Sequence, residues 1–166
     1  MSSIIVDGYN LTGTSHGDLA GQRESLVSLL IRYKKIRGHD ITVVFDGWQS
    51  GGGREVSLTT GGVKVIYSRL GEKADYVIKR IIRLEKKEWI VISSDREIMA
   101  AAWACGSVPV SSDKFLSIIE KTEKSLHDEY GRESEEEEDY GPVHRKGNPR
   151  QPSKKDRALA RTLEKL

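Results

Sequence analysis

The sequence contains a single cysteine and four prolines in 166 residues, and it has no long apolar run. One cysteine excludes an intrachain disulfide framework and any zinc site built from several cysteines. No segment approaches the about 20 apolar residues that are needed to cross a bilayer. The first residues also lack the basic and long apolar regions of a signal peptide. We therefore expect a cytoplasmic protein that does not contact membranes.

Charged residues make up 31% of the chain, and the formal net charge of +2 conceals blocks of opposite sign. Residues 1–127 carry 18 Lys/Arg against 15 Asp/Glu, residues 133–139 are almost entirely acidic, and residues 144–165 hold eight Lys/Arg against two acids. Such blocks are usually solvated, and basic tails often contact nucleic acid. We predict one domain over residues 1–127 and a charged, flexible tail over 128–166, which either binds nucleic acid or only aids solubility. Residues 153–166 can form a short helix, which alone in water would be marginal.

Short apolar runs alternate with helical stripes along the first 127 residues. Strands are predicted at 4–6, 41–45, 63–67, 89–92 and 108–110, with a short extended piece at 55–58. Helices are predicted at 22–37, 74–87, from about 94 to 104, and from about 111 to 126. This alternation implies right-handed crossovers and an α/β fold, a three-layer α/β/α sandwich with a mostly parallel central sheet.

Local signals refine these elements. Ser94 and Glu97 fit a capping box at the start of the helix that ends at residue 104. Pro109 favours an edge position for the last strand. Leu84 extends the apolar stripe of the helix over 74–87 and is predicted to face inward. Histidines are scattered through loops and the tail and are predicted to be surface residues: His16, His39, His127 and His144.

Four aspartates follow predicted strands, where ligands bind in an open parallel sheet. They are Asp7, Asp46, Asp75 and Asp95. Each also has a structural explanation, because Asp-Gly pairs make turns and carboxylates are favoured in the first turn of a helix. Clustered carboxylates repel one another and destabilise the fold unless a cation neutralises them. Four on one edge therefore favour Mg²⁺ or Mn²⁺, which prefer oxygen ligands and can activate water for phosphodiester cleavage.

Other common chemistries lack their motifs. The chain has no P-loop, no dinucleotide-binding glycine pattern and no serine nucleophile elbow. Four basic residues lie near the aspartate edge and could bind RNA phosphates: Arg54, Arg69, Lys73 and Arg96. Tyr9 and Trp48 could stack on splayed bases, although partial core packing explains them equally well.

Several of these segments, in order over about residues 3–120, together resemble the NYN domain, in its YacP-type branch within the PIN-like nuclease superfamily. They are Ile5-Val6-Asp7-Gly8-Tyr9-Asn10, Val43-Val44-Phe45-Asp46-Gly47, Val65-Ile66-Tyr67-Ser68, Ala74-Asp75 and Ile92-Ser93-Ser94-Asp95-Arg96-Glu97. The resemblance implies a PIN-like fold and Mg²⁺- or Mn²⁺-dependent endoribonuclease activity. It makes Asp7, Asp75 and Asp95 metal ligands, with Asp46 completing or bordering the acidic pocket. Asn10 would orient a ligand or a phosphate.

The resemblance also implies RNA as the substrate, messenger RNA in particular, and the ribosome as a partner. Our first hypothesis is a metal-dependent endoribonuclease. The alternative is a non-catalytic RNA- or ribosome-binding module with the same fold, which would bind RNA in a salt-sensitive manner without needing a divalent metal. A phosphatase is disfavoured because Gly8 and Tyr9 follow Asp7 in place of an Asp-x-Asp arrangement. A structure-specific DNA nuclease that uses a related acidic pocket stays open as a further alternative.

Overall fold

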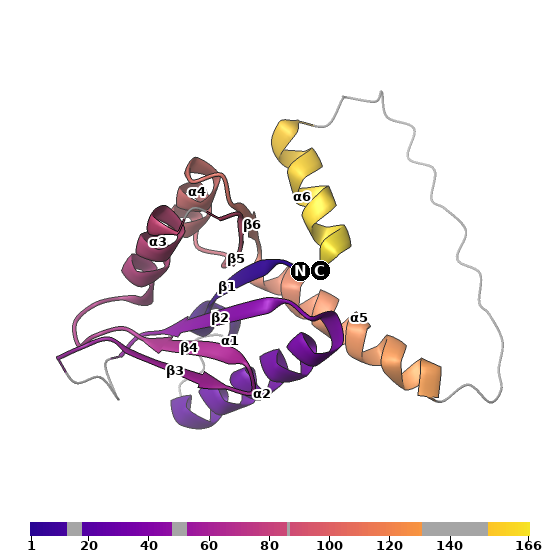
Figure 1. The fold of residues 1–166 in the computed structure, drawn as a ribbon, viewed down its shortest axis with the longest axis horizontal. Helices are drawn as coiled ribbons and strands as arrows, with labels where there is room; N and C mark the ends of the chain where they lie inside the picture. The colour runs from indigo at the N-terminus through magenta and orange to yellow at the C-terminus, as the bar shows by residue number, and fades with distance from the viewer. Residues whose placement is uncertain (13–17, 48–52, 86, 131–152) are drawn as a thin grey trace.

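One mixed sheet of six strands forms the centre of the protein (Figure 1). The computed structural model describes residues 1–12, 18–47, 53–85, 87–130 and 153–166. Within them the strand order is β3-β4-β2-β1-β5-β6, and every neighbouring pair is parallel except β3 and β4. The strands are β1 (Ser3–Asp7), β2 (Asp40–Phe45), β3 (Val56–Thr60), β4 (Val63–Tyr67), β5 (Trp89–Ile92) and β6 (Val108–Val110).

Helices cover both faces of this sheet (Figure 1). They are α1 (Gly8–Thr12), α2 (Leu19–Arg37), α3 (Ala74–Leu84), α4 (Arg96–Ala104), α5 (Ser112–Tyr130) and α6 (Lys154–Lys165). Alternate residues of β1 enter two separate cores, since Ile4 packs with the α2 and α5 side chains while Ile5 packs with those of α3 and α4. The predicted three-layer α/β/α sandwich with a mostly parallel sheet is confirmed.

Strand β1 lies at the centre of the sheet, between β2 and β5. Ile4, Ile5 and Val6 are completely buried, as a continuous apolar run requires when both faces of a strand are covered. The chain passes from β1 to β2 and β4 on one side and to β5 and β6 on the other. The carboxyl end of β1 is thus a switch point, where open parallel sheets bind their ligands.

Some local predictions were wrong. The Asp7-Gly8 pair does not make a simple turn, because α1 begins at Gly8 directly after β1. Leu84 is 73% exposed and does not face inward, because α3 ends there instead of continuing to Lys87. The capping box of Ser94 does not form, because Asp95 is the N-cap of α4.

Among the histidines, His39 is only 5% exposed, so it is not a surface residue. Its Nδ1 accepts a hydrogen bond from the backbone N–H of Ser2 at 3.3 Å. His16 and His144, the side chain of His127, and Trp48 lie outside the described residues. The predicted edge position of Pro109 is confirmed, because β6 ends the sheet.

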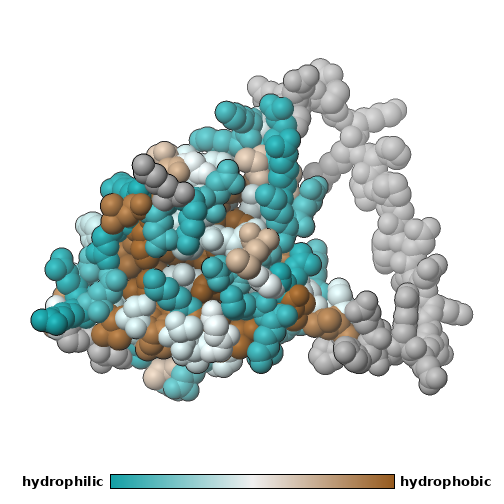
Figure 2. Space-filling view, in the orientation of Figure 1, coloured by the Kyte–Doolittle hydropathy of each residue, from teal (hydrophilic) through white to brown (hydrophobic). Residues whose placement is uncertain are grey.

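Helix α6 packs against the domain although it belongs to the segment that we expected to be a flexible tail. A capping box of Ser153 and Asp156 begins the helix. At its other end Leu166 is 1% exposed, and its carbonyl oxygen accepts hydrogen bonds from the Tyr33 hydroxyl (2.5 Å) and Arg37 Nε (2.7 Å). Tertiary packing therefore stabilises a helix whose own apolar stripe is thin, while its outer face is hydrophilic (Figure 2). Residues 131–152, with the acidic block, lie outside the described ranges.

No helix in the described part of the chain is long and apolar enough to span a membrane.

Candidate active site

Asp7, the last residue of β1, is a buried carboxylate at the switch point. Its side chain accepts hydrogen bonds from the Asn10 backbone N–H at 3.4 Å and from the Ser93 hydroxyl at 3.1 Å. Desolvation by burial is the main reason that the pKa of Asp7 rises to about 6, and the carboxylates of Asp75 and Asp46 raise it further. No lysine, arginine or histidine of the described residues forms an ion pair with it. Asp7 is thus a buried acid that lacks a cation.

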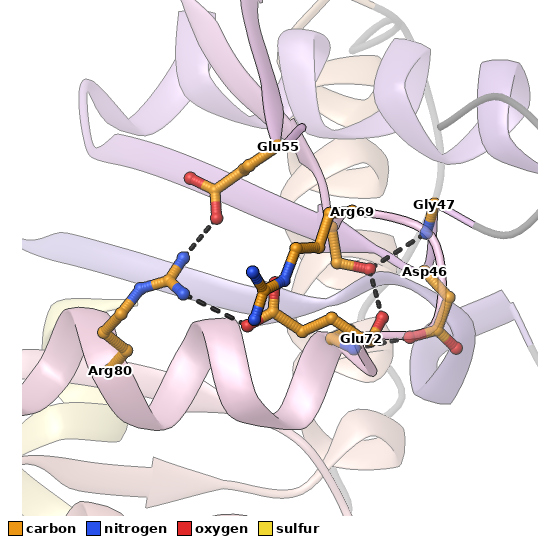
Figure 3. A network of polar contacts seen from close by, with 8 residues as sticks. Asp46, Gly47, Glu55, Arg69, Glu72 and Arg80 are labelled. Carbon is orange, nitrogen blue, oxygen red and sulfur yellow. Dashed lines mark hydrogen bonds and ion pairs between the residues drawn. The ribbon is translucent and has the colours of Figure 1, made fainter. Parts of the chain in front are cut away.

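Asp46 follows β2 and points to the start of α3 (Figure 3). Its Oδ1 accepts a hydrogen bond from the Ala74 backbone N–H, an amide that the first turn of α3 leaves unpaired. Asp46 is therefore bound to the first turn of α3, which also carries Asp75. Sequence reasoning explained Asp46 equally well by a turn, and its capping of a helix 28 residues away has no local signal.

The loop between β4 and α3 is held to the end of β2 by a polar network (Figure 3). The Ser68 hydroxyl accepts from the Gly47 N–H at 3.0 Å and donates to the Glu72 carbonyl oxygen at 2.5 Å. The carboxylate of Glu72 pairs with Arg69 at 3.5 Å and with Arg80 at 3.1 Å. Because single exposed ion pairs contribute only about 0–1 kcal/mol, the role of this network is geometric: it fixes the start of α3 relative to Asp46.

Asp75 lies in the first turn of α3 and is partly exposed. It forms an ion pair with Lys79, whose Nζ lies 3.8 Å from Asp75 Oδ2 and only 3.0 Å from the Glu97 carboxylate. The hydrogen bond from Lys79 to Glu97 is the main reason that the pKa of Lys79 is raised. Lys79 therefore contacts Glu97 more closely than it contacts Asp75. The Asp75 carboxylate also lies within electrostatic reach of Asp7.

Asp95 is engaged in helix capping. Its Oδ1 accepts hydrogen bonds from the backbone N–H groups of Glu97 (2.7 Å) and Ile98 (3.2 Å). Its own N–H donates to the Ser93 hydroxyl at 3.1 Å, and that hydroxyl donates to Asp7. Asp95 is therefore joined to the acidic cluster through Ser93, which is fully buried.

Asn10 connects three segments at the same edge. Its Oδ1 accepts from the Ser94 backbone N–H at 2.8 Å and from the Ser112 hydroxyl at 2.6 Å. The Ser94 hydroxyl in turn accepts from the Ser112 N–H at 3.1 Å. These bonds hold the ends of β1 and β5 and the start of α5 together. Sequence reasoning missed Ser93 and Ser112, for which the only signal was a pair of small hydroxyl residues after each of the last two strands.

The predicted site residues thus fall into three groups. Asp46 and Asp75 both lie within electrostatic reach of Asp7. Asp95 and Asn10 are bound to the same edge through hydrogen bonds. The four predicted basic residues lie outside this group of carboxylates, and all four are exposed: Arg54, Arg69, Lys73 and Arg96. Arg69 also pairs with Glu72. Tyr9 packs its ring edge-on against Phe45, with ring centroids 5.6 Å apart, so core packing accounts for much of its side chain.

The donor set suits a hard divalent cation. In the described ranges, no group of three or more His, Cys, Asp or Glu side chains is arranged to hold one metal ion. Mg²⁺ commonly needs fewer, because it binds one or two carboxylates and completes its shell with water and substrate phosphates. Asp7 and Asp75 supply only oxygen donors, and Asp7 is buried without a cation, so these residues fit such an ion.

The sheet order, the covering helices and the acidic carboxyl edge define an α/β domain of the PIN-like nuclease fold. The family model described as the YacP-like NYN domain matches residues 4–156, so the chain belongs to this family. Crystal structures of Rae1 (YacP) from Bacillus subtilis share its fold. One gives a TM-score of 0.63 over 78% of this chain, and a point mutant gives 0.62 over 76%. Both are 24% identical to this chain over 80% of their own length. No curated protein matches the sequence.

Proposed function

We propose that this protein is a divalent-metal-dependent endoribonuclease that cleaves phosphodiester bonds within RNA. The observation that carries the proposal is Asp7, a buried carboxylate with no ion-pair partner among the described residues, within electrostatic reach of Asp46 and Asp75. A fold alone does not establish an activity. An uncompensated acid at the switch point of the sheet is costly to the fold, however, and such a cost is typical of a catalytic site.

The side chains have distinct roles in this proposal. Asp7 and Asp75 would hold the cation, with Asp46 bordering the pocket and Asp95 contributing from the end of β5. A divalent cation there would supply charge neutralisation and Lewis-acid polarisation of the phosphodiester. Ser93 and the Asn10 backbone hold the Asp7 carboxylate in one orientation by their hydrogen bonds. Asp7 also loses its proton near neutral pH, because its pKa is about 6, so the ligand is ionised at physiological pH.

RNA is the proposed substrate. Its phosphates would contact four exposed basic side chains, namely Arg54, Arg69, Lys73 and Arg96. Membership of the YacP-like family supports RNA as the substrate. We further propose that the substrate is messenger RNA bound to the ribosome and that the protein acts in the cytoplasm.

The test is cleavage of labelled single-stranded and structured RNA, and of DNA, with Mg²⁺, Mn²⁺ or a chelator. We expect RNA fragments only with a divalent metal. Asp7→Asn and Asp75→Asn should lower cleavage to the level seen with the chelator. Asp40→Asn is the matched control, because Asp40 begins β2 at the opposite edge of the sheet and is exposed.

Two results would contradict the proposal. If both the Asp7 and the Asp75 variants cut RNA at the parent rate, the carboxylates do not form the catalytic centre. If the parent binds RNA in a salt-dependent manner but cuts neither RNA nor DNA with any metal, the protein is a binding module that keeps the nuclease fold.

A further inference from the structure

A groove of about 500 Å³ lies between α2 and the β3–β4 hairpin. Its lining is mixed, with apolar side chains from both elements together with Tyr67 and Arg23. Arg23 is the fifth residue of α2 and is only 8% exposed. Arginine is almost never this buried unless its charge is paired.

The Arg23 guanidinium lacks an anionic partner. Its Nε donates to the Leu19 carbonyl oxygen at 3.2 Å, and its central carbon lies 5.7 Å from the centre of the Tyr67 ring. Its Nη1 is buried without a hydrogen-bond partner, and no carboxylate in the described residues forms an ion pair with Arg23. The Leu19 carbonyl oxygen and the Tyr67 ring are both neutral, so they stabilise the guanidinium charge only in part. A buried cation in this state is costly unless a ligand supplies the missing anion.

The groove adjoins the acidic cluster through Tyr9. The Tyr9 hydroxyl is buried beside the Arg23 side chain, and it also lies within electrostatic reach of Asp46. Tyr9 is two residues from Asp7, and its ring packs on Phe45, which stacks on Tyr67. A continuous set of side chains therefore leads from the carboxylates to the guanidinium.

We propose that Arg23 binds a phosphate of the RNA strand next to the phosphodiester that is cleaved. This inference rests on the proposed function, since it assigns a second contact to the same substrate. A guanidinium is suited to the role, because its planar donors match phosphate oxygens and it remains charged when buried. The Tyr9 hydroxyl can donate to the same phosphate.

The lining of the groove, as far as the structure describes it, supports an external anion. Glu24 is the one acidic residue among the described groove-lining residues, and it is exposed. Its charge opposes phosphate, so removing it should strengthen RNA binding.

The test compares full-length Arg23→Met and Arg23→Lys with Arg83→Met, an exposed arginine of α3 on the other face of the sheet. RNA binding is measured by fluorescence anisotropy with a chelator, so that no cleavage is needed. We expect Arg23→Met to weaken binding about tenfold and to reduce the salt slope by about one. The RNA affinity of Arg23→Lys should lie between those of Arg23→Met and the parent. Arg83→Met should bind RNA with the affinity of the parent, and Glu24→Gln should bind it more tightly.

Thermal unfolding separates a binding role from a structural one. Removal of an unpaired buried charge should leave the melting temperature of Arg23→Met unchanged or raise it. A lower melting temperature with parent-like RNA binding would overturn the proposal. If Arg23→Met does not fold, parent-like binding by Arg23→Lys and Glu24→Gln would overturn it equally. If Arg23→Met binds RNA more weakly but the parent cuts no RNA, the proposed catalysis is refuted while the phosphate contact of Arg23 stands.

Discussion

Replacing Asp7 with asparagine removes a carboxylate whose pKa is raised from 3.8 to about 6, chiefly because the side chain is buried. The folded protein therefore holds the Asp7 proton more tightly than the unfolded chain does. Between these two pKa values the native state binds more protons, so the Asp7 contribution to stability falls as pH rises from about 4 to about 6. A shift of this size corresponds to roughly 3 kcal/mol of lost stability once the pH exceeds both values.

Asp7→Asn should recover this loss. Asparagine has a similar shape and can keep the hydrogen bond from the Asn10 N–H, but it carries no charge. Without metal at pH 8, we expect the variant to be more stable than the parent by up to about 3 kcal/mol, and near pH 4 by less than about 1 kcal/mol. The measurement is urea unfolding at both pH values with a chelator present, where a shifted midpoint at constant slope reports stability alone.

Added metal should make the parent more stable than Asp7→Asn. A ligand that binds only the folded state stabilises it by about 4.1 kcal/mol at 1,000 times its dissociation constant, which exceeds the roughly 3 kcal/mol advantage of the variant, so saturating Mg²⁺ should stabilise the parent but not Asp7→Asn. Asp40→Asn, which removes an exposed carboxylate, should show neither effect. If Asp7→Asn is less stable than the parent at pH 8, the burial argument fails. If Mg²⁺ stabilises both equally, Asp7 is not a metal ligand.

Two further predictions concern the supports of the site and of the fold. A Cβ atom at Gly47 would lie 1.6 Å from the Ser68 carbonyl oxygen, whereas one at Gly53 would meet nothing within 4 Å. Gly47→Ala should therefore cost at least about 2 kcal/mol and lower RNA cleavage by displacing the loop beside Asp46, while Gly53→Ala should do neither. Leu166→Ala should lower the free energy of unfolding by about 2–5 kcal/mol, because Leu166 is a buried core residue. A loss below 0.5 kcal/mol in urea unfolding would show that α6 is not packed on the domain in solution.

Much of the fold could be predicted because its signals are local. Strands buried on both faces must be short apolar runs, so β1, β2, β4 and β5 stand out in the sequence. Helices predicted from apolar stripes began and ended within a few residues of α2 to α5, and errors such as Leu84 fell at their ends. Arg23 was missed for a physical reason. An arginine on an amphipathic helix normally lies on the solvent face, and only packing against the β3–β4 hairpin buries it.

By itself, the sequence determined that four aspartates follow parallel strands and that oxygen-ligand chemistry is possible there, because strand ends and residue types are local properties. Only the tertiary structure decided which aspartates meet. The sheet order places β1 between β2 and β5, which brings Asp46 and Asp75 within reach of Asp7 and leaves Asp95 capping α4. The same order brings the Ser93 hydroxyl to the Asp7 carboxylate from 86 residues away. Contacts of that separation depend on strand order and burial, which arise from packing the whole chain.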